Sequence, residues 1–579
     1  MERLQTIYLL HNQILFNFTL TPNTLKPIVA RSLFSPPFYQ ASMKASLTRF
    51  NILLLILLPA LITGGLLIFA GNLSDGLRLG FLSLPGVAFI YLAISQQIIY
   101  WYMLSIVWWF IAWLDALLRS STWFLFNSDN EAYFIVEAIA NTNQQETWEF
   151  LQLHLNTIAI IVLSLLTLLA IYSFSAFKLI KTRHFNQLWN SRIYRSCIIL
   201  LVLLTVTSYL MKPSRNIHPV VFWSDYQTKI QDFQNRIKQH KDVHHQWDLS
   251  AKQSLILTTP KNEKQTHVLV LSESLTSLNL GVCGYPRNTT PELAKKVDQL
   301  HIFCNAFSPA PSTINALRVL LTESPASEHD QYSPKSILAY ARAAGYKIYW
   351  LSNQDDSYLS SLFGSYADKA VYKNTRSGRS STSLDETLMP TYQQALADPN
   401  PKKLIILHLI GAHPNYQERY SAMFNKFNSE SDDVIERDLK NRNIDPWIRS
   451  LRNDYDNAVL YQDSLLVKFL ETLQADHKPD FRSFTMVSDH GNEVGHEIDY
   501  AGHSPNTKAG YQVPVIMWYD KIPVTGVNKD KTLNTAELDN NLMHIMGLKD
   551  KSAPPQSYWL DDDYHFTPEA NWPYWNNKS

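Results

Sequence analysis

The sequence lacks an excess of charge of either sign. Lys and Arg together number 51, and so do Asp and Glu, so the formal net charge is zero. A balanced charge argues against a generally basic nucleic-acid-binding protein and against an acidic disordered tail. The chain also lacks internal repeats and low-complexity tracts, while hydrophobic residues make up 46% of it. That share is enough for a sizeable core and excludes an intrinsically disordered protein.

Cysteine is scarce as well. The three cysteines cannot build a disulfide scaffold, and no Cys-x-x-Cys zinc pattern is present. Cys197 lies in an apolar run, which leaves Cys283 and Cys304 in the rest of the chain. These two could form one bridge in an oxidising compartment or remain buried thiols, and the sequence leaves both alternatives open.

Long apolar runs are rare after residue 212, whereas the first part of the chain holds about five of them. They cover residues 52–71, 80–94, 98–114, 155–177 and 196–210. Runs of this length are typical of helices that cross the hydrocarbon core of a bilayer. The 15 Trp residues fit a membrane interface. We therefore predict an N-terminal extension over 1–50, in which Met43 is an alternative start of translation, and a transmembrane domain over 51–211.

The basic residues of the short loops predict how the spans are oriented. Several lie before the first run or between the last two: Arg31, Lys44, Arg49, Lys178, Lys181, Arg183, Arg192 and Arg195. Such loops stay in the cytoplasm. With five spans, the segment 119–154 and everything after residue 212 lie on the far side. We expect a multi-pass protein of a bacterial inner membrane, with a linker or bridging helix over 212–265 and a periplasmic domain over 266–579.

Short β-rich runs alternate with helical patterns after residue 266. The predicted strands are His267–Leu271, Lys347–Leu351, Leu404–Ile410, Phe484–Val487 and Val513–Trp518. Among the helices, Pro334–Ala344 has Ser333 as its expected N-cap, and a second covers Asp456–Leu473. This alternation predicts an α/β fold with a mostly parallel central sheet, in which ligands bind at the carboxyl ends of the strands.

Side chains of the kind that bind metals follow three of these strands. They are Glu273, His413 and the pair Asp489-His490, and His503 comes shortly afterwards. Carboxylates combined with histidines suit zinc or manganese better than calcium or magnesium. Each residue alone could be a cap or a solvated surface group, but their joint placement at one sheet edge favours a metal site. His496 is the alternative to His503.

Thr313 is the candidate nucleophile. Ser312 is the expected N-cap of a helix whose apolar residues begin at Ile314, so Thr313 falls in the first turn. A helix N-terminus binds phosphate or sulfate well, and a threonine hydroxyl becomes nucleophilic once a metal or base removes its proton. The alternative is that both residues only cap the helix.

Taken together, these segments resemble bacterial phosphoethanolamine transferases of the alkaline phosphatase superfamily. The similar motifs occur in the family's order at residues 272–274, 284–291, 311–313, 345–354, 407–413, 455–457 and 488–491. The runs Gly284–Pro291 and Ser352-Asn353-Gln354 are most similar to the branch that modifies the heptose of the lipopolysaccharide core. The lipid A branch usually has paired cysteines around its nucleophile, and this chain has none there.

The resemblance implies an alkaline-phosphatase-like domain that holds zinc, in preference to manganese, on Glu273, Thr313, Asp489 and His490. Thr313 would take phosphoethanolamine from phosphatidylethanolamine as a covalent intermediate. An acceptor on core heptose, lipid A or a glucan would then receive the group. His413 and His503 would bind phosphoryl oxygens, protonate a leaving group or hold a second metal.

The resemblance also suggests three substrate-binding residues. Asn353 would contact substrate or support its strand end. Thr142 and Glu146, four residues apart in the far-side segment, would share a helical face that binds the lipid head group, or would lie on an ordinary surface helix. The competing hypotheses are a phosphoglycerol transferase, a sulfatase-like hydrolase, for which Pro311-Ser312-Thr313 lacks the usual motif, and a membrane protein that binds an envelope ligand without turnover.

Overall fold

The structure is a computed structural model that describes most of the chain from residue 57 to residue 572. Outside the described residues lie 1–56, 71–72, 97, 127–134, 137–138, 141–146, 149–150, 153, 183–191, 259–262, 328–331, 355–356, 375–382, 430–432, 521, 555–556, 570–571 and 573–579.

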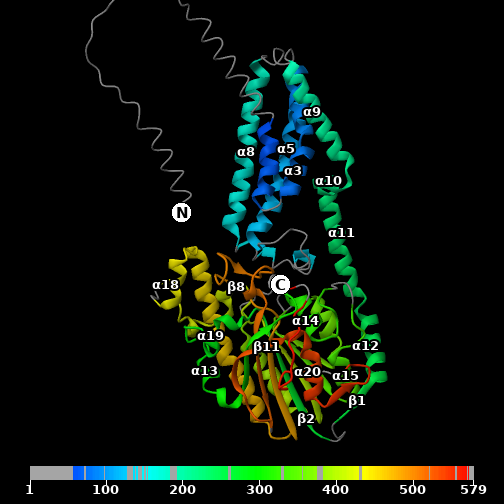
Figure 1. Cartoon of the computed structure of the whole chain (residues 1–579), viewed down its shortest axis with the longest axis vertical. Coiled ribbons are helices and arrows are strands. Elements are labelled where there is room, and N and C mark those ends of the chain that lie inside the picture. Colours follow the sequence, from blue (N-terminus) through cyan, green and yellow to red (C-terminus); the bar gives the residue numbers. More distant parts are fainter. Residues whose placement is uncertain are drawn as a thin grey trace, which may run out of the picture. The chain divides into compact units, whose positions relative to one another are not determined.

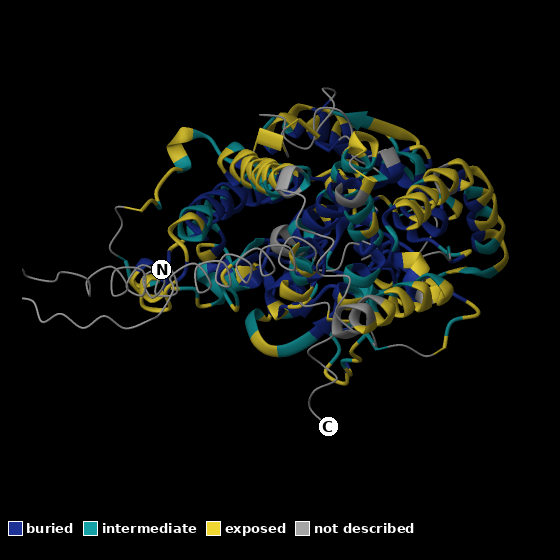
Figure 2. Cartoon of the chain, turned by 90° about the horizontal axis from the view of Figure 1, so that it is seen from above, coloured by how far each residue is buried: buried dark blue, intermediate teal, exposed yellow. Residues whose placement is uncertain are grey.

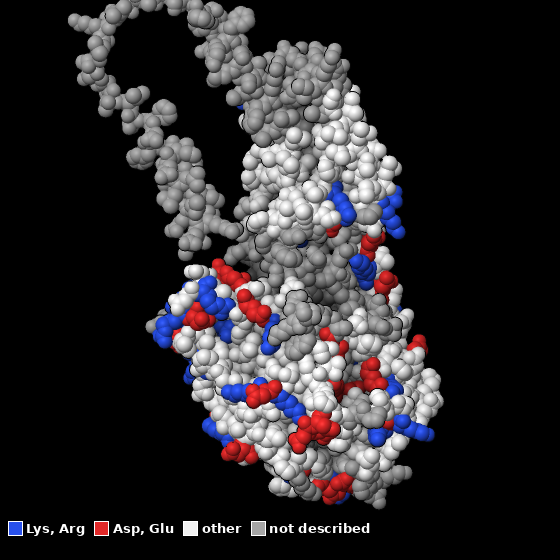
Figure 3. Space-filling model, viewed as in Figure 1, with Lys and Arg blue, Asp and Glu red and all other residues white. Residues whose placement is uncertain are grey.

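The first part of the described chain is a group of apolar helices (Figure 1). They are α3 (Leu73–Leu82), α4 (Pro85–Gln96), α5 (Ile99–Phe126), α8 (Leu155–Thr182) and α9 (Arg192–Leu210). On the face shown in Figure 3, few charged side chains lie on these helices, whereas both signs are mixed over the domain that follows. Many large side chains of α8 are exposed, for example Leu163 and Phe174, as expected of a helix that faces lipid.

The structure supports fewer spans than the five that we predicted. Among the described residues, three stretches are long and apolar enough to cross a membrane: Leu73–Ala93, Ile99–Thr122 and Leu155–Lys178. The first of them combines α3 and α4. Leu57–Phe69 and Ile199–Leu210 are apolar helices of shorter length, so the five-span count is not confirmed.

The predicted bridging segment is largely helical. It contains α10 (Lys212–Ile217), α11 (Pro219–Lys238) and α12 (His240–Ser254). One face of α12 packs into the main core of the following domain through Val243, Trp247 and Ala251. The indole of Trp247 donates a hydrogen bond to the carbonyl of Ser333 (3.0 Å). The core of that domain therefore includes residues that precede residue 266.

An eight-stranded sheet forms the centre of the C-terminal domain, in the order β11-β3-β10-β7-β2-β6-β4-β5. The strands are β2 (Gln265–Ser272), β3 (His301–Phe307), β4 (Lys347–Ser352), β5 (Lys369–Tyr372), β6 (Lys402–His408), β7 (Phe481–Ser488), β10 (Gln512–Tyr519) and β11 (Gly526–Asn534). Within this sheet β10 runs antiparallel to both of its neighbours, and the other pairs are parallel. The predicted mostly parallel sheet is confirmed.

Helices cover both faces of the sheet and create two cores (Figure 1). One face carries α12, α14 (Thr313–Leu320), α15 (Ile337–Ala343) and α20 (Leu538–Ile545). The other carries α13 (Pro291–Ala294), α17 (Met389–Ala397) and α19 (Pro446–Gln474). Successive residues of Val268–Leu271 in β2 point alternately into the two cores, which is why this part of the strand is apolar without interruption. Figure 2 shows the buried segments in the interior and the exposed faces of the helices around them.

The remaining elements are small. They are β1 (Leu255–Leu257) paired with β12 (Leu548–Asp550), β8 (Glu493–Val494) paired with β9 (Ala501–Gly502), α16 (Ser357–Leu359) and α18 (Val434–Asn441).

Two predicted helix starts were wrong. The N-cap of α15 is Ser336 rather than Ser333, because the Ser336 hydroxyl accepts the N–H of Leu338. Gly345, with φ of 87°, follows the end of this helix. The long helix α19 begins at Pro446, capped by Asp445, well before Asp456. Its first turns carry charged side chains that form buried ion pairs, so they lack the apolar periodicity by which helices are recognised.

Candidate active site

The candidate site lies at the carboxyl ends of three adjacent strands. Glu273 directly follows β2, Asp489 and His490 follow β7, and His413 follows β6 after a short turn. Because β7, β2 and β6 are neighbours and parallel, their ends bring these residues together. Glu273, Asp489 and His490 are almost completely buried.

Thr313 lies in the middle of this group. Its Oγ1 donates toward both carboxylate oxygens of Glu273, at 3.1 Å each, and lies 3.5 Å from Nε2 of His490. Nε2 of His490 is also 3.3 Å from Oε1 of Glu273 and 3.4 Å from Oδ2 of Asp489. Ser312 has the extended backbone of an N-cap, and Thr313 is the first residue of α14. The structure therefore brings together all four residues that we expected to hold zinc.

His413 and His503 lie beside the same carboxylate. Each of these histidines and Glu273 offers one ligand atom, and these three atoms lie within 4.8 Å of one another. The rings of His490 and His503 are 4.4 Å apart, centre to centre. His496, the alternative to His503, lies elsewhere, with its Nε2 2.7 Å from the side-chain oxygen of Asn279.

The chemistry of the four central residues fits a zinc ion. Oδ1 of Asp489 accepts the backbone N–H groups of Ser274 and His490, while the buried Oδ2 accepts no hydrogen bond from the described residues. Nδ1 of His490 is hydrogen-bonded to the carbonyl of Gly491 (2.7 Å), which directs Nε2 into the cluster. Carboxylate oxygens, an imidazole nitrogen and a hydroxyl within bonding reach of one point are donors that zinc accepts.

The electrostatics of the cluster also favour a cation. Burial raises the pKa of Asp489, and the neighbouring negative charge of Glu273 raises it further. Burial lowers the pKa of His490, but the charges of Asp489 and Glu273 outweigh this effect and raise the pKa to about 9. Two buried carboxylates this close need a positive partner, which is either a proton on His490 or a metal ion.

Glycine is required at position 411 for the turn that leads to His413. Gly411 has φ of 56°, and a Cβ there would lie 2.5 Å from the carbonyl oxygen of Glu273. The next residue, Ala412, donates its N–H to that same carbonyl (2.9 Å). The close contact fixes the β6 turn against the residue that carries the central carboxylate.

Two supporting residues were missed in the sequence analysis. The buried carboxylate of Asp385 accepts the backbone N–H groups of Ile410 and Gly411 and so holds that turn. Gln354 donates to Oε2 of Glu273 (3.2 Å). Gln354 could have been noticed, because it belongs to the Ser-Asn-Gln run, whereas the sequence around Asp385 contains no comparable signal.

Of the three residues predicted to bind substrate, only Asn353 lies among the described residues, and its side chain is hydrogen-bonded to residues outside this cluster. The side-chain amide of Asn353 donates to Ser383 and Asp385, and its oxygen accepts from the Ser383 hydroxyl. This arrangement favours the alternative in which Asn353 supports its strand end. Thr142 and Glu146 lie outside the described residues.

A disulfide joins Cys283 to Cys304. Of the two alternatives that the sequence left open, a bridge or two free thiols, the structure has the bridge. The Gly284–Pro291 run begins beside it. Within that run, Arg287 forms ion pairs with Asp456 (2.7 Å) and Asp433 (2.8 Å). Two motifs that are far apart in the sequence, around Arg287 and Asp456, are thus joined by a buried ion pair.

Comparison with known proteins agrees with this geometry. Residues 265–548 match the family model described as Sulfatase. The chain is 33% identical over 305 residues to phosphoethanolamine transferase EptC of Escherichia coli, which covers 50% of this chain and 52% of that protein. It is 32% identical over 266 residues to phosphoethanolamine transferase CptA of Salmonella typhimurium, covering 44% and 45%. The matches span about half the length of these relatives.

A solved structure extends the similarity of the fold to the helical part. The integral membrane protein lipooligosaccharide phosphoethanolamine transferase A from Neisseria meningitidis superposes with a TM-score of 0.52 at 19% identity, covering 83% of this chain and 96% of that one. Residues 265–548 are therefore similar to the sulfatase family, and the two curated relatives named above are phosphoethanolamine transferases.

Proposed function

We propose that the chain transfers phosphoethanolamine from phosphatidylethanolamine to lipopolysaccharide, with core heptose as the preferred acceptor and lipid A as the alternative. The observation that carries this proposal is the position of Thr313. Its hydroxyl lies at a helix N-terminus, 3.1 Å from the carboxylate oxygens of Glu273. It is also 3.5 Å from Nε2 of His490, which in turn lies 3.4 Å from Oδ2 of Asp489. A hydroxyl so placed is built for nucleophilic attack at phosphorus.

Glu273, Thr313, Asp489 and His490 would hold one zinc ion. When bound, the metal would lower the pKa of the Thr313 hydroxyl and offset the charge on the transferring phosphoryl group. Oδ2 of Asp489, which accepts no hydrogen bond from the described residues, and the inward Nε2 of His490 are the atoms that support this assignment.

The protein's own residues supply the rest of the first step. The hydrogen bond from Thr313 to Glu273 orients Oγ1 toward an incoming phosphorus. Oγ1 gives its proton to Glu273, to which it already donates, and a bond forms between Oγ1 and phosphorus as the bond from phosphorus to the diacylglycerol oxygen breaks. His413 or His503, both beside Glu273, gives a proton to that oxygen, so that diacylglycerol leaves as a neutral alcohol.

The second step reverses these roles. A hydroxyl of the acceptor attacks the phosphorus and loses its proton to the same imidazole. The bond between Thr313 and phosphorus then breaks, and Oγ1 takes back the proton from Glu273, which restores the threonine. The apolar helices support a place in the bacterial inner membrane, with the catalytic domain in the periplasm, because an anchored enzyme meets two lipid substrates within one membrane surface.

Mass spectrometry of lipopolysaccharide tests this function. A host that lacks its own such transferases would express the wild-type chain or Thr313→Ala, and both proteins would be quantified in the membrane. A phosphoethanolamine addition that occurs only with wild type is expected, and fragmentation would locate it on core or lipid A. A phosphoglycerol addition would instead indicate the related transfer reaction, and no addition with protein present would contradict the proposal.

A further inference from the structure

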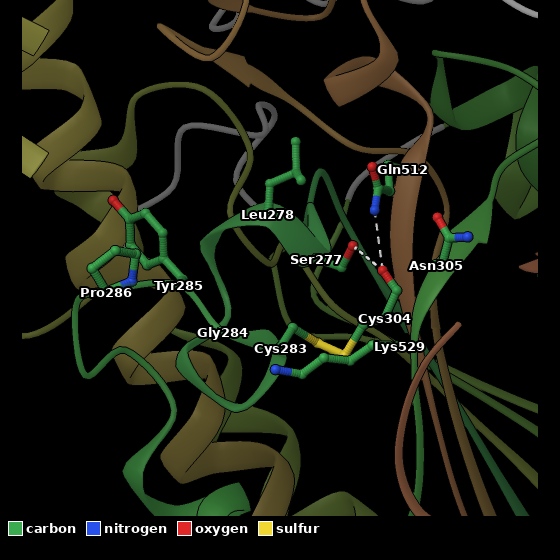
Figure 4. A pocket seen from close by; sticks show the side chains of 10 residues that line it. All are labelled: Ser277, Leu278, Cys283, Gly284, Tyr285, Pro286, Cys304, Asn305, Gln512 and Lys529. Atoms are coloured by element: carbon green, nitrogen blue, oxygen red, sulfur yellow. Dashed lines mark hydrogen bonds between the residues drawn. A yellow bond between two sulfur atoms is a disulfide. The ribbon is translucent and has the colours of Figure 1, made fainter. Parts of the chain in front are cut away.

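A pocket of about 320 Å³ lies beside the Gly284–Pro291 run, apart from the zinc ligands. Figure 4 shows Tyr285 and Pro286 at one end, Gln512 and Asn305 at the other, and the Cys283–Cys304 bridge between them. The conspicuous motif that plays no part in the chemical steps therefore supplies a wall of this pocket. Its volume is within the usual range of ligand-binding cavities.

Lys529 reaches this pocket because of an irregularity in β11. Asn528 pairs with Phe303 and Thr532 with Asn305, so three residues of β11 lie opposite one residue of β3. The side chain of Asn528 stabilises the bulge by accepting the N–H groups of Asp530 and Lys531. Bulges of this kind redirect a side chain and are common next to functional sites.

Gly284 leaves space for the Lys529 side chain, and the Cys283–Cys304 disulfide holds the loop that carries this glycine. Nζ of Lys529 lies 3.1 Å from the position that a Cβ on Gly284 would occupy, and Gly284 has φ of 105°. The disulfide fixes the loop that carries Gly284 to β3. Although the lysine is exposed, Nζ forms no ion pair or hydrogen bond with any part of the chain that the structure describes. An unpaired cation is thus presented at a pocket whose shape three separate features maintain.

The side-chain amides of Gln512 and Asn305 indicate which ligand groups the pocket would bind besides an anion. The side-chain N–H groups of Gln512 and Asn305 are used, since they donate to the carbonyl of Cys304 (3.1 Å) and the hydroxyl of Thr532 (2.7 Å). Their side-chain oxygens accept no hydrogen bond from the described residues, although Gln512 is buried. These two amide oxygens could accept hydrogen bonds from hydroxyl groups of a ligand, and the nearby ammonium group of Lys529 could bind an anionic group.

We propose that this pocket is a binding site for a sugar phosphate unit of the acceptor glycolipid. The anion would pair with Lys529, the hydroxyl groups would donate to Asn305 and Gln512, and Tyr285 would offer an aromatic edge to the sugar. The pocket begins four residues after Glu273, at Ser277, and Gln512 opens β10 on the edge that carries the zinc ligands. Its role as an acceptor site rests on the proposed function, but binding itself requires no turnover.

Calorimetric titration of the full chain in detergent with glucose 6-phosphate tests this site. We expect Lys529→Ala to weaken binding about tenfold, the loss typical of one charge-assisted hydrogen bond. Lys549→Ala is the matched control, because Lys549 is an exposed lysine on β12, outside the pocket, and should leave binding unchanged. Thr313→Ala should also bind normally, which separates failure of this site from failure of the transfer reaction.

Glucose and inorganic phosphate, titrated separately, complete the experiment. Both should bind more weakly than glucose 6-phosphate, and Asn305→Leu should weaken glucose 6-phosphate but not phosphate. Equal affinity of the Lys529→Ala and Lys549→Ala variants would place the anion elsewhere, at the zinc site for example, and overturn the proposal. Phosphate that binds as tightly as glucose 6-phosphate would overturn it too, since the pocket would then not recognise a sugar.

Discussion

The hydroxyl of Thr313 is equidistant from the two carboxylate oxygens of Glu273, at 3.1 Å from each. The two residues are 40 positions apart in the sequence and come from different elements, the start of α14 and the end of β2. A polar contact thus joins the start of the helix to the end of the strand, and the activity that we propose depends on it.

Replacing Thr313 should abolish transfer without unfolding the protein. Thr313→Ala removes the attacking oxygen, so we expect activity to fall by about a thousandfold or more, as for other nucleophile deletions. Thr313→Ser keeps a hydroxyl and should retain measurable transfer. Thr472→Ala, on the surface of α19, is the control and should be unaffected. Normal transfer by Thr313→Ala would rule out the threonine as nucleophile.

Zinc content should depend on Glu273. Glu273→Gln keeps the size of the side chain but removes the charge that both Thr313 and His490 contact, so zinc per purified chain should fall several-fold. Elemental analysis after dialysis measures this directly. Glu471→Gln, an exposed residue paired with Lys296, is the control. If Glu273→Gln retains as much zinc as wild type, the metal is bound by other residues.

Gly411 offers a test of the packing beneath the site. Gly411→Ala would place a Cβ 2.5 Å from the Glu273 carbonyl, in addition to the strain of φ at 56°. We expect a loss of about 2–4 kcal/mol in the free energy of unfolding and a loss of transfer, because the turn and Glu273 must separate.

Gly345→Ala measures the backbone strain without the steric contact. Gly345 also has a positive φ, of 87°, but a Cβ there would meet nothing within 4 Å. It should therefore cost about 1 kcal/mol from backbone strain alone. Urea unfolding of both variants gives the comparison, and equal losses would show that the contact with Glu273 is unimportant.

The Cys283–Cys304 bridge should stabilise the domain. It closes a loop with a sequence separation of 21, for which chain entropy predicts about 3 kcal/mol. Cys283→Ser should therefore lower the urea midpoint, and reductant should lower that of wild type to a similar value. Cys197→Ser, in the apolar run, should leave the midpoint unchanged. A wild-type midpoint that does not respond to reductant would show that the bridge does not form.

The sequence was informative where residues are locally patterned. All five predicted strands are in the sheet, since each is an apolar run that ends in polar residues. Three strands of the eight-stranded sheet were not predicted, for physical reasons. The edge strand β11 is polar, with Asn, Lys and Asp at its centre, β5 is a short edge strand, and β3 interleaves apolar residues with His301, Cys304 and Asn305.

The candidate site was predictable as a set of side chains but not as a geometry. Strand ends indicated Glu273, Asp489 and His490, yet nothing local indicates that Asp385 holds the turn before His413, since its partners lie 25 and 26 residues away. Likewise the bulge that directs Lys529 depends on pairing with β3, which no pattern within β11 reveals.

The most direct test of the central claim is to look for phosphoethanolamine on Thr313 itself. The purified, zinc-loaded chain would be mixed with phosphatidylethanolamine in detergent without acceptor, quenched in acid, digested and analysed by mass spectrometry. We predict that the peptide containing Thr313 gains the mass of one phosphoethanolamine group, with diacylglycerol released in equal amount, and that Thr313→Ala gains nothing. Diacylglycerol release without modification of Thr313, or modification of a different residue, would contradict it.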